Sequence, residues 1–189
     1  ACTDRGIAVD RALRTNIPHI FAVGDCNGEH EFSHAAMHQG MLALMNCMLP
    51  GPLKRNFRSY LVPSTIFTEP QISQVGCSRR ELEDGGVKFE AVKVRYDDYG
   101  AAIAEGIATG FVKVLLSPTG RILGATVVGE GSADMINEWG LAIQKGLRMH
   151  SILMLQHSFP SMAFLNKRAA ETWMVGRMRA NAWLRRLAR

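Results

Sequence analysis

Long apolar runs are missing from this chain of 189 residues. No uninterrupted apolar stretch approaches the ~20 residues that a membrane-spanning helix needs. The first residues show neither the basic nor the apolar segment of a secretory signal. Hydrophobic residues make up 47% of the sequence and charged residues 21%, which is typical of a folded globular protein. We therefore expect a cytoplasmic protein of one domain or a little more.

Closely spaced cysteines are missing as well. The four cysteines lie 24, 21 and 30 residues apart along the chain. This spacing matches neither a redox pair of the CxxC type nor a zinc ribbon. We expect reduced thiols at all four positions, which are Cys2, Cys26, Cys47 and Cys77.

Acidic residues are scarce at the C-terminal end. The net charge is +5, and residues 167–189 hold seven basic residues and one acid, which is +6, so the rest sums to −1. Apolar side chains interleave with this charge: Trp173, Met174, Met178, Trp183, Leu184 and Leu187. The pattern predicts a basic amphipathic helix over 167–189. Such a helix could contact an anionic membrane or nucleic acid, but we favour packing on its own domain or on a second subunit, and we expect no nucleic-acid partner.

A short apolar run near the front, Ile20 to Val23, stops at Gly24 and Asp25. The pattern predicts a strand that ends in a carboxylate. Groups at the carboxyl end of a strand face the ligand crevice of an α/β sheet, so Asp25 is placed to accept hydrogen bonds from cofactor hydroxyls. A helix that starts near Ser33 would point its unpaired N–H groups at the same place.

The remaining segments predict an α+β fold with an antiparallel sheet flanked by helices. Residues 6–10 are expected to form an edge strand and 33–47 a helix that ends before Pro50. A capping-box pattern predicts a helix after Ser78, and apolar periodicity predicts another over 132–147. Strands are expected at 64–68, 88–96, 110–116 and 121–128, the last two joined by the hairpin turn at 117–120.

Several motifs in a fixed order resemble the FAD-dependent pyridine nucleotide-disulfide oxidoreductases, the family of dihydrolipoamide dehydrogenase, glutathione reductase and mercuric reductase. The motifs cover nearly the whole chain and lie at 14–25, 34–40, 66–76, 102–106, 110–114, 122–125 and 157–161. The resemblance implies that residues 1–50 close an α/β FAD-binding domain. It further implies a linker at 51–62, an interface or dimerisation domain at 63–166 and the basic helix at 167–189.

The same resemblance implies the cofactors and their contacts. Gly24 and Asp25 would hold the ribityl chain of FAD, and the backbone at His34, Ala35 and Ala36 would face the isoalloxazine. NAD(P)H would be the electron donor, the protein a homodimer, and the acceptor a small molecule, a thiol or a metal ion. The chain lacks a Gly-x-Gly-x-x-Gly fingerprint and an initial methionine, so we expect it to be the C-terminal part of a longer enzyme.

The acid/base motif of the family is altered in this sequence. The histidine before proline is replaced by Phe159, and the following glutamate position is Phe164. Neither side chain carries a proton, so lipoamide dehydrogenase activity is not expected, and the resemblance is to the mercuric reductase branch. His157 remains as a catalytic candidate, and a structural role is the interpretation that we favour. The alternative hypothesis is a non-catalytic dimerisation or membrane-docking module.

A rival interpretation concerns metal binding near the front of the chain. Cys26, His30, His34 and His38 recur every four residues, which would stack ligands on one helical face. However, Asn27 and Gly28 are expected to break that helix. We therefore predict no intrinsic metal site.

Overall fold

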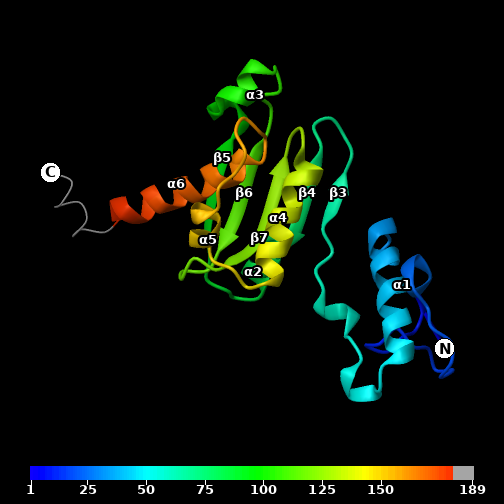
Figure 1. Ribbon diagram of the computed structural model, residues 1–189. Helices are drawn as coiled ribbons and strands as arrows, with labels where there is room; N and C mark the ends of the chain where they lie inside the picture. Colours follow the sequence, from blue (N-terminus) through cyan, green and yellow to red (C-terminus); the bar gives the residue numbers. More distant parts are fainter. Residues whose placement is uncertain (181–189) are drawn as a thin grey trace. The chain divides into compact units, whose positions relative to one another are not determined.

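The computed structural model describes residues 1–180 and divides the chain into two compact units, Ala1–Val62 and Pro63–Arg189 (Figure 1). Residues 181–189 lie outside the described part, and the predictions for Trp183, Leu184 and Leu187 fall on them.

The N-terminal unit is built around one long helix. Its core brings together Leu13, Leu42, Ala43 and Phe57. The unit comprises the antiparallel pair β1 (Cys2–Thr3) and β2 (Gly6–Ile7), the 3-10 turn η1 (Gly24–Asn27), helix α1 (Ser33–Met48), and the turns η2 (Gly51–Leu53) and η3 (Phe57–Ser59). The predicted helix is thus present, one residue longer than expected.

Helix α1 has two contrasting faces and contains no Asp, Glu, Lys or Arg. One face is buried and consists of Ala35, Gln39, Leu42, Ala43 and Asn46. The other is apolar yet exposed within this chain and consists of Met37, Met41, Leu44 and Met48. Positions 37, 41, 44 and 48 follow the helical period of 3.6, so these side chains form one continuous stripe.

The predicted strand at Ile20 to Val23 is wrong. Among the described residues this segment forms only an isolated bridge between Arg14 and Phe21. A strand needs a neighbouring strand to take its hydrogen bonds, and here only the preceding segment of the chain lies alongside. The edge strand predicted at 6–10 is shortened to β2 because the Asp10 carboxylate accepts from the backbone of Ala12 at 2.8 Å and turns the chain.

The C-terminal unit contains a five-stranded antiparallel sheet in the order β3-β4-β7-β6-β5. The hairpin turn at 117–120 is confirmed, and Gly120 adopts the left-handed φ of 78° that this turn requires. The α+β prediction of an antiparallel sheet with flanking helices is also confirmed. The strands are β3 (Ser64–Ile66), β4 (Ile72–Gly76), β5 (Glu90–Arg95), β6 (Phe111–Leu116) and β7 (Ile122–Val128).

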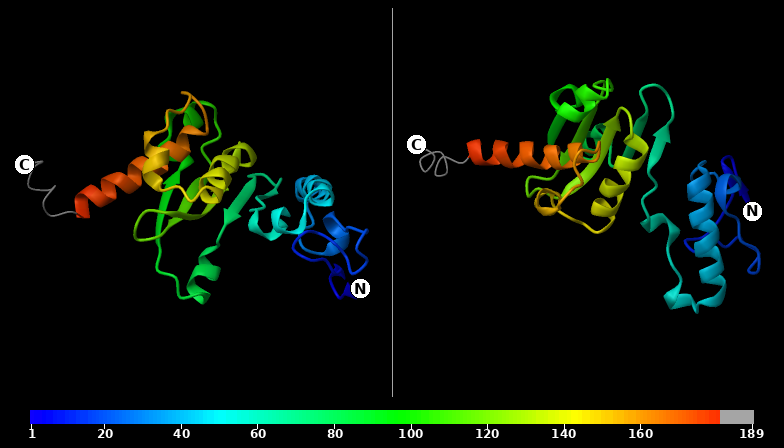
Figure 2. Two further views of the ribbon diagram at one scale, coloured as in Figure 1. Left: turned by 60° about the horizontal axis from the view of Figure 1, so that its bottom comes forward. Right: turned by 45° about the horizontal axis from the view of Figure 1, so that its top comes forward.

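Helices cover one face of this sheet. Helix α4 (Ser132–Gln144) packs on β4 and β7, whereas α6 (Phe164–Ala180) packs on β5 and β6 beside α5 (Met149–Met154). Figure 2 shows the last turns of α6 extending past the sheet. Helix α6 begins three residues before its predicted start at 167. The short elements are α2 (Arg79–Asp84), η4 (Tyr96–Asp98) and α3 (Gly100–Ala104).

The start of α2 confirms the predicted capping box. The Ser78 hydroxyl accepts from the Glu81 backbone N–H at 3.2 Å, and a Glu81 carboxylate oxygen accepts from the Ser78 N–H at 2.7 Å. The hydrogen bond from the Ser78 backbone N–H, with a smaller contribution from the Ser78 hydroxyl, favours the charged Glu81 carboxylate and lowers its pKa. Both partners lie within one short segment, which is why the sequence alone predicts the contact.

Tyr96 lies in the main core with no exposed surface, and its hydroxyl donates to the Glu130 carbonyl at 2.8 Å. Burial, with a smaller contribution from the Glu130 carboxylate, raises the pKa of the phenol. Because the folded-state pKa lies above the unfolded value, this stabilisation is complete below about pH 10 and is lost as pH rises toward the folded-state pKa.

We expect Tyr96→Phe to lower the free energy of unfolding by about 1 kcal/mol at neutral pH, because the hydrogen bond to Glu130 is lost. Above about pH 10 the difference should shrink, since only the wild type loses stability by ionising the phenol. Urea unfolding at about pH 8 and pH 11, followed by circular dichroism, measures both effects. A difference that does not change with pH would contradict this assignment.

Candidate functional site

The turn η1 carries Asp25, the predicted cofactor ligand, and is fixed by two unusual glycines. Gly24 has a φ of 74°, and a Cβ placed on it would lie 2.9 Å from the Ala36 Cβ. Gly28 ends the turn with a φ of 67°, and a Cβ there would lie 2.1 Å from the Arg5 carbonyl oxygen. Glycine is therefore required at both positions. The turn packs directly on the first turns of α1.

Asp25 itself is exposed. Within residues 1–180 its carboxylate makes no hydrogen bond or ion pair. The nearby helix α1 has Phe32 at its N-cap position, and no side chain caps the helix there. The positive end of a helix dipole and an unengaged carboxylate thus belong to the same turn-helix unit. Such an arrangement can accept hydrogen bonds from hydroxyls and donate to an anionic or carbonyl group.

The predicted contact residues on α1 are brought to this turn, although they are not equivalent. Ala35 is buried on the inner face, Ala36 touches Gly24, and His34 is exposed and stacks on Phe32 with ring centroids 5.4 Å apart. The three predicted contact residues therefore differ in how accessible their side chains are.

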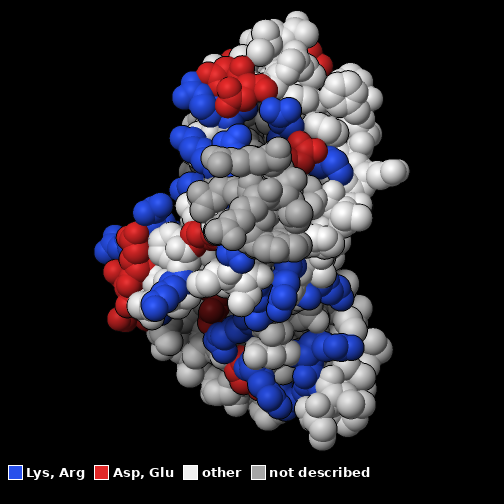
Figure 3. Space-filling view, turned by 90° about the vertical axis from the view of Figure 1, so that its left-hand side faces the viewer, with Lys and Arg blue, Asp and Glu red and all other residues white. Residues whose placement is uncertain are grey.

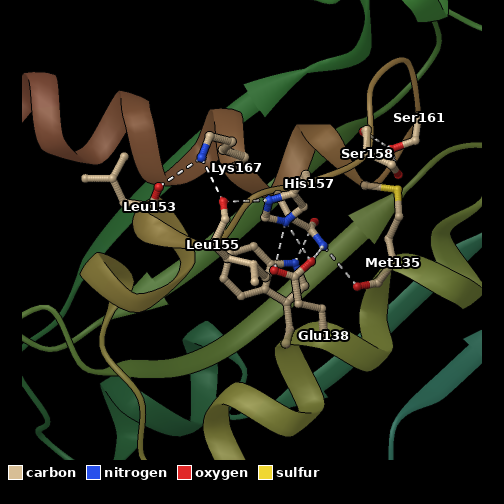
Figure 4. A network of polar contacts seen from close by, with 10 residues as sticks. Met135, Glu138, Leu153, Leu155, His157, Ser158, Ser161 and Lys167 are labelled. Carbon is tan, nitrogen blue, oxygen red and sulfur yellow. Dashed lines mark hydrogen bonds and ion pairs between the residues drawn. The ribbon is translucent and has the colours of Figure 1, made fainter.

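His157 lies in a network of polar contacts in the C-terminal unit (Figure 4). Its side chain is 5% exposed, and its Nε2 lies 3.0 Å from Glu138 Oε1. A carboxylate only accepts, so Nε2 carries the hydrogen of this bond. The other ring nitrogen, Nδ1, lies 3.3 Å from the Leu155 carbonyl oxygen, which also accepts from Lys167 Nζ at 2.8 Å.

Asn166 extends this network into the core. Its side-chain N–H donates to Glu138 Oε2 at 2.8 Å, and its Oδ1 accepts from the Trp139 indole at 2.8 Å. Asn166 and Trp139 have no exposed surface. The contacts join the loop that carries His157 to α4 and α6.

Phe159 and Phe164 form an aromatic cluster with Tyr99. The Phe159 and Phe164 rings meet edge to face at 5.2 Å, and Phe164 stacks on Tyr99 at 5.9 Å. The Tyr99 hydroxyl is engaged, because it donates to the Ser161 carbonyl at 3.0 Å. Phe159 is 70% exposed. This segment therefore presents an aromatic hydrocarbon surface.

The four thiols are free and exposed. Helix α1 begins at Ser33, so Cys26 and His30 lie outside it and do not share its face with His34 and His38. Gly28 ends η1 in the left-handed conformation, which confirms the predicted break. Across residues 1–180, no three His, Cys, Asp or Glu side chains converge as a metal site would require.

The described part of the basic segment packs on its own unit. The Trp173 indole donates to Glu90 Oε1 at 2.8 Å, and Arg177 donates to the Pro118 carbonyl at 3.2 Å. On the face seen in Figure 3, both basic and acidic side chains are present. Arg95 and Asp97 form an ion pair in the same unit. No helix within residues 1–180 combines the length and apolar character needed to cross a membrane.

Three polar residues that organise these regions were not predicted from the sequence: the buried Gln39 and Asn166, and the half-buried Glu138. Gln39 and Asn166 are 3% and 0% exposed. Gln39 is one of two amides, with Asn46, on the buried inner face of α1, and that polar position was the available signal. The identity of its partners depends on contacts between segments distant along the chain.

The fold of the C-terminal unit and the turn-helix of the N-terminal unit together define a flavoprotein reductase architecture, and comparisons with known proteins agree. The sequence pattern of the pyridine nucleotide-disulphide oxidoreductase dimerisation domain matches residues 62–169. The pattern of the pyridine nucleotide-disulphide oxidoreductase domain itself matches residues 1–40. The chain belongs to the pyridine nucleotide-disulphide oxidoreductase family. Members of this family use FAD and NAD(P)H.

The proteins that this chain resembles in sequence include dihydrolipoyl dehydrogenases. The enzyme of Haemophilus influenzae is 34% identical over 161 residues, which cover 84% of this chain and 33% of the relative. The enzyme of Chlamydia pneumoniae is 35% identical over 180 residues, 94% of this chain and 37% of the relative. The chain thus spans about a third of the length of these relatives. These relatives support membership of the family. The likeness to the mercuric reductase branch stays a prediction.

Two solved structures share the fold. LpdA from Mycobacterium tuberculosis superposes with a TM-score of 0.80 at 26% identity, covering 89% of this chain and 37% of that one. The HOCl-induced flavoprotein disulfide reductase RclA from Escherichia coli has a TM-score of 0.80 at 24% identity, covering 93% of this chain and 40% of that one. The second likeness concerns the fold alone.

Proposed function

We propose that this chain is the flavin-contacting and dimerisation part of an FAD-dependent, NAD(P)H-oxidising disulfide oxidoreductase. The observation that carries the proposal is the turn-helix unit, in which the exposed Asp25 carboxylate follows Gly24 and the turn packs against a helix that has no side-chain cap. FAD supplies the transfer of reducing equivalents from NAD(P)H to the acceptor. Asp25 would hold the ribityl hydroxyls, and the backbone from His34 to Ala36 would face the flavin ring.

The residues present fit such a cofactor. A carboxylate is an acceptor for sugar-type hydroxyls, and the N-terminus of a helix stabilises negative charge on a reduced ring. The close approach of Gly24 to Ala36 leaves no room for a side chain between turn and helix. Among residues 1–180, the buried Gln39 Nε2 beside the same turn has no hydrogen-bond partner.

The segment from Phe159 to Phe164 supports a reductase that lacks the family's acid/base pair. Phe159 and Phe164 occupy the two positions, and hydrocarbon rings transfer no proton. His157 contacts Glu138 and the Leu155 carbonyl through its two ring nitrogens. These contacts favour a structural role for His157, as a link between its loop and α4. We therefore propose a chemistry closer to that of mercuric reductase than to that of lipoamide dehydrogenase.

We further propose a homodimer formed through the C-terminal unit. The family match to a dimerisation domain covers this unit. Large apolar side chains are exposed on it within this chain, including Phe67 at 76% and Met154 at 68%. Burial of such side chains is the usual driving force for a stable subunit interface. The 159–164 segment would then serve the active site of the partner, where a small molecule, thiol or metal ion accepts electrons.

The test is the visible spectrum of the full-length protein during anaerobic titration with NADH. We expect a flavin spectrum that bleaches on reduction. A long-wavelength charge-transfer band at that point would identify a thiolate beside the flavin and direct the search to thiol or metal acceptors. A colourless dimer that binds no added FAD would overturn the proposal in favour of the alternative, a dimerisation module without turnover.

A further inference from the structure

Gln39 joins α1 to the turn that carries Asp25. Its side chain is 3% exposed and points from the inner face of α1 toward η1. The Gln39 Oε1 accepts two hydrogen bonds, one from the Gly24 backbone N–H at 2.8 Å and one from Asn27 Nδ2 at 2.7 Å. The first and last residues of the turn are thus held by a single oxygen atom.

Among residues 1–180, the Gln39 Oε1 is the acceptor of the Gly24 N–H. The first N–H groups of any helical turn lack partners within it, and Val23, at the N-cap of η1, provides no side-chain cap. The Gln39 side chain, which lies 15 residues further along the chain in α1, supplies this cap. Because Gly24 is buried, loss of the acceptor would leave its N–H unsatisfied at a cost that exposed amides do not bear.

Asn27 completes the connection. Its amide nitrogen also donates to the Ala22 carbonyl at 3.2 Å, and its Oδ1 accepts from the Glu29 N–H at 3.1 Å. Asn27 therefore ties the segments before and after the turn to the same glutamine. Asp25 lies between the two residues that Gln39 holds.

The orientation of the Gln39 amide follows from its partners. Both neighbours donate, so the oxygen must face them, and the nitrogen must point elsewhere. Within the described residues that nitrogen is buried and has no hydrogen-bond partner. The Gln39 side chain thus has one hydrogen-bond donor beside the turn that no described residue accepts from.

We infer that Gln39 is a positioning residue for the cofactor: it fixes the Gly24–Asn27 turn against α1, so that the Asp25 carboxylate and the helix N-terminus keep a constant relation. The cofactor role of Gln39 rests on the proposed function, because the Asp25 carboxylate and the N-terminus of α1 would hold FAD. The connection itself stands on the hydrogen bonds of the N-terminal unit.

The test compares Gln39→Met with Asn46→Leu in the full-length protein. Both variants replace a buried amide of α1 with an apolar side chain of similar size. Asn46 has no exposed surface and contacts Ala12 and Arg55, away from the turn. We expect Gln39→Met to weaken FAD binding about 10- to 100-fold, because two buried donors lose their acceptor. Asn46→Leu should lower the melting temperature while the folded protein binds FAD like wild type.

Gln39→Glu is the conservative variant, since it keeps an acceptor oxygen at the same position. It should restore FAD binding to within about threefold of wild type. If Gln39→Met binds FAD as tightly as wild type, the positioning role is overturned while the proposed function stands. If Asn46→Leu weakens FAD binding equally, the effect belongs to helix stability and the inference also fails.

Hydrogen exchange of the apoprotein tests the connection between Gln39 and the turn separately from its role in cofactor binding. The Gly24 amide should exchange at least about tenfold faster in Gln39→Met than in Asn46→Leu, whether or not flavin is present. Unchanged protection would overturn the connection itself. A wild-type protein that shows this protection but binds no FAD would overturn the proposed function and the cofactor role, and leave the connection as a structural one.

Discussion

Full-length protein carrying Asp25→Asn is expected to bind FAD about 10- to 100-fold more weakly than wild type. The exposed carboxylate makes no hydrogen bond or ion pair within residues 1–180, so its charge is available to cofactor hydroxyls. Asparagine keeps the shape and one acceptor but loses the charge that strengthens such bonds. Fluorescence titration of the apoprotein with FAD measures the difference directly.

Asp4→Asn is the matched control for this change. Asp4 is also exposed, lies in the same N-terminal unit between β1 and β2, and loses the same charge on substitution. The Asp4→Asn variant should bind FAD as tightly as wild type. Equal affinities for all three proteins would remove Asp25 from the cofactor site.

A second large effect is expected in the C-terminal unit, where Trp139→Ala should lower the free energy of unfolding by about 3–5 kcal/mol. Trp139 has no exposed surface, and its indole donates to Asn166. Alanine would leave a cavity under α4 and an unsatisfied acceptor at Asn166. Urea unfolding followed by circular dichroism would report the loss.

Leu141→Ala on the same helix serves as the control. Leu141 is 61% exposed in this chain, and its truncation should change the stability by less than about 0.5 kcal/mol. Trp139→Phe keeps most of the buried ring and should fall between the two. A small effect of Trp139→Ala would show that the core can collapse around the missing ring.

Local signals predicted the elements that close within a few residues. The hairpin turn ending at Gly120 and the capping box at Ser78 each contain their own partners, so their sequence is sufficient. The prediction of a strand at Ile20 was wrong for the opposite reason. Its apolar run satisfied the pattern, but a strand also needs a neighbour, and the pattern contains no information about one.

The candidate site was predictable in outline and not in detail. Asp25 and the start of α1 followed from an apolar run that ends in a carboxylate, even though the run is no strand. The contacts of Gln39 and of the pair His157 and Glu138 join segments far apart in the chain. Such partners follow from packing, which periodicity alone does not specify.

The apolar stripe of α1 makes the surface chemistry of this helix sensitive to oxidants. Met37 is 77% exposed, Met41 50% and Met48 72%. Oxidation turns a methionine thioether into a polar sulfoxide, so three neighbouring positions on an uncharged helix would change from apolar to polar together. Mass spectrometry after mild peroxide treatment would detect the added oxygen atoms at these positions. Their resistance in the full-length protein would then report how much of the stripe is covered there.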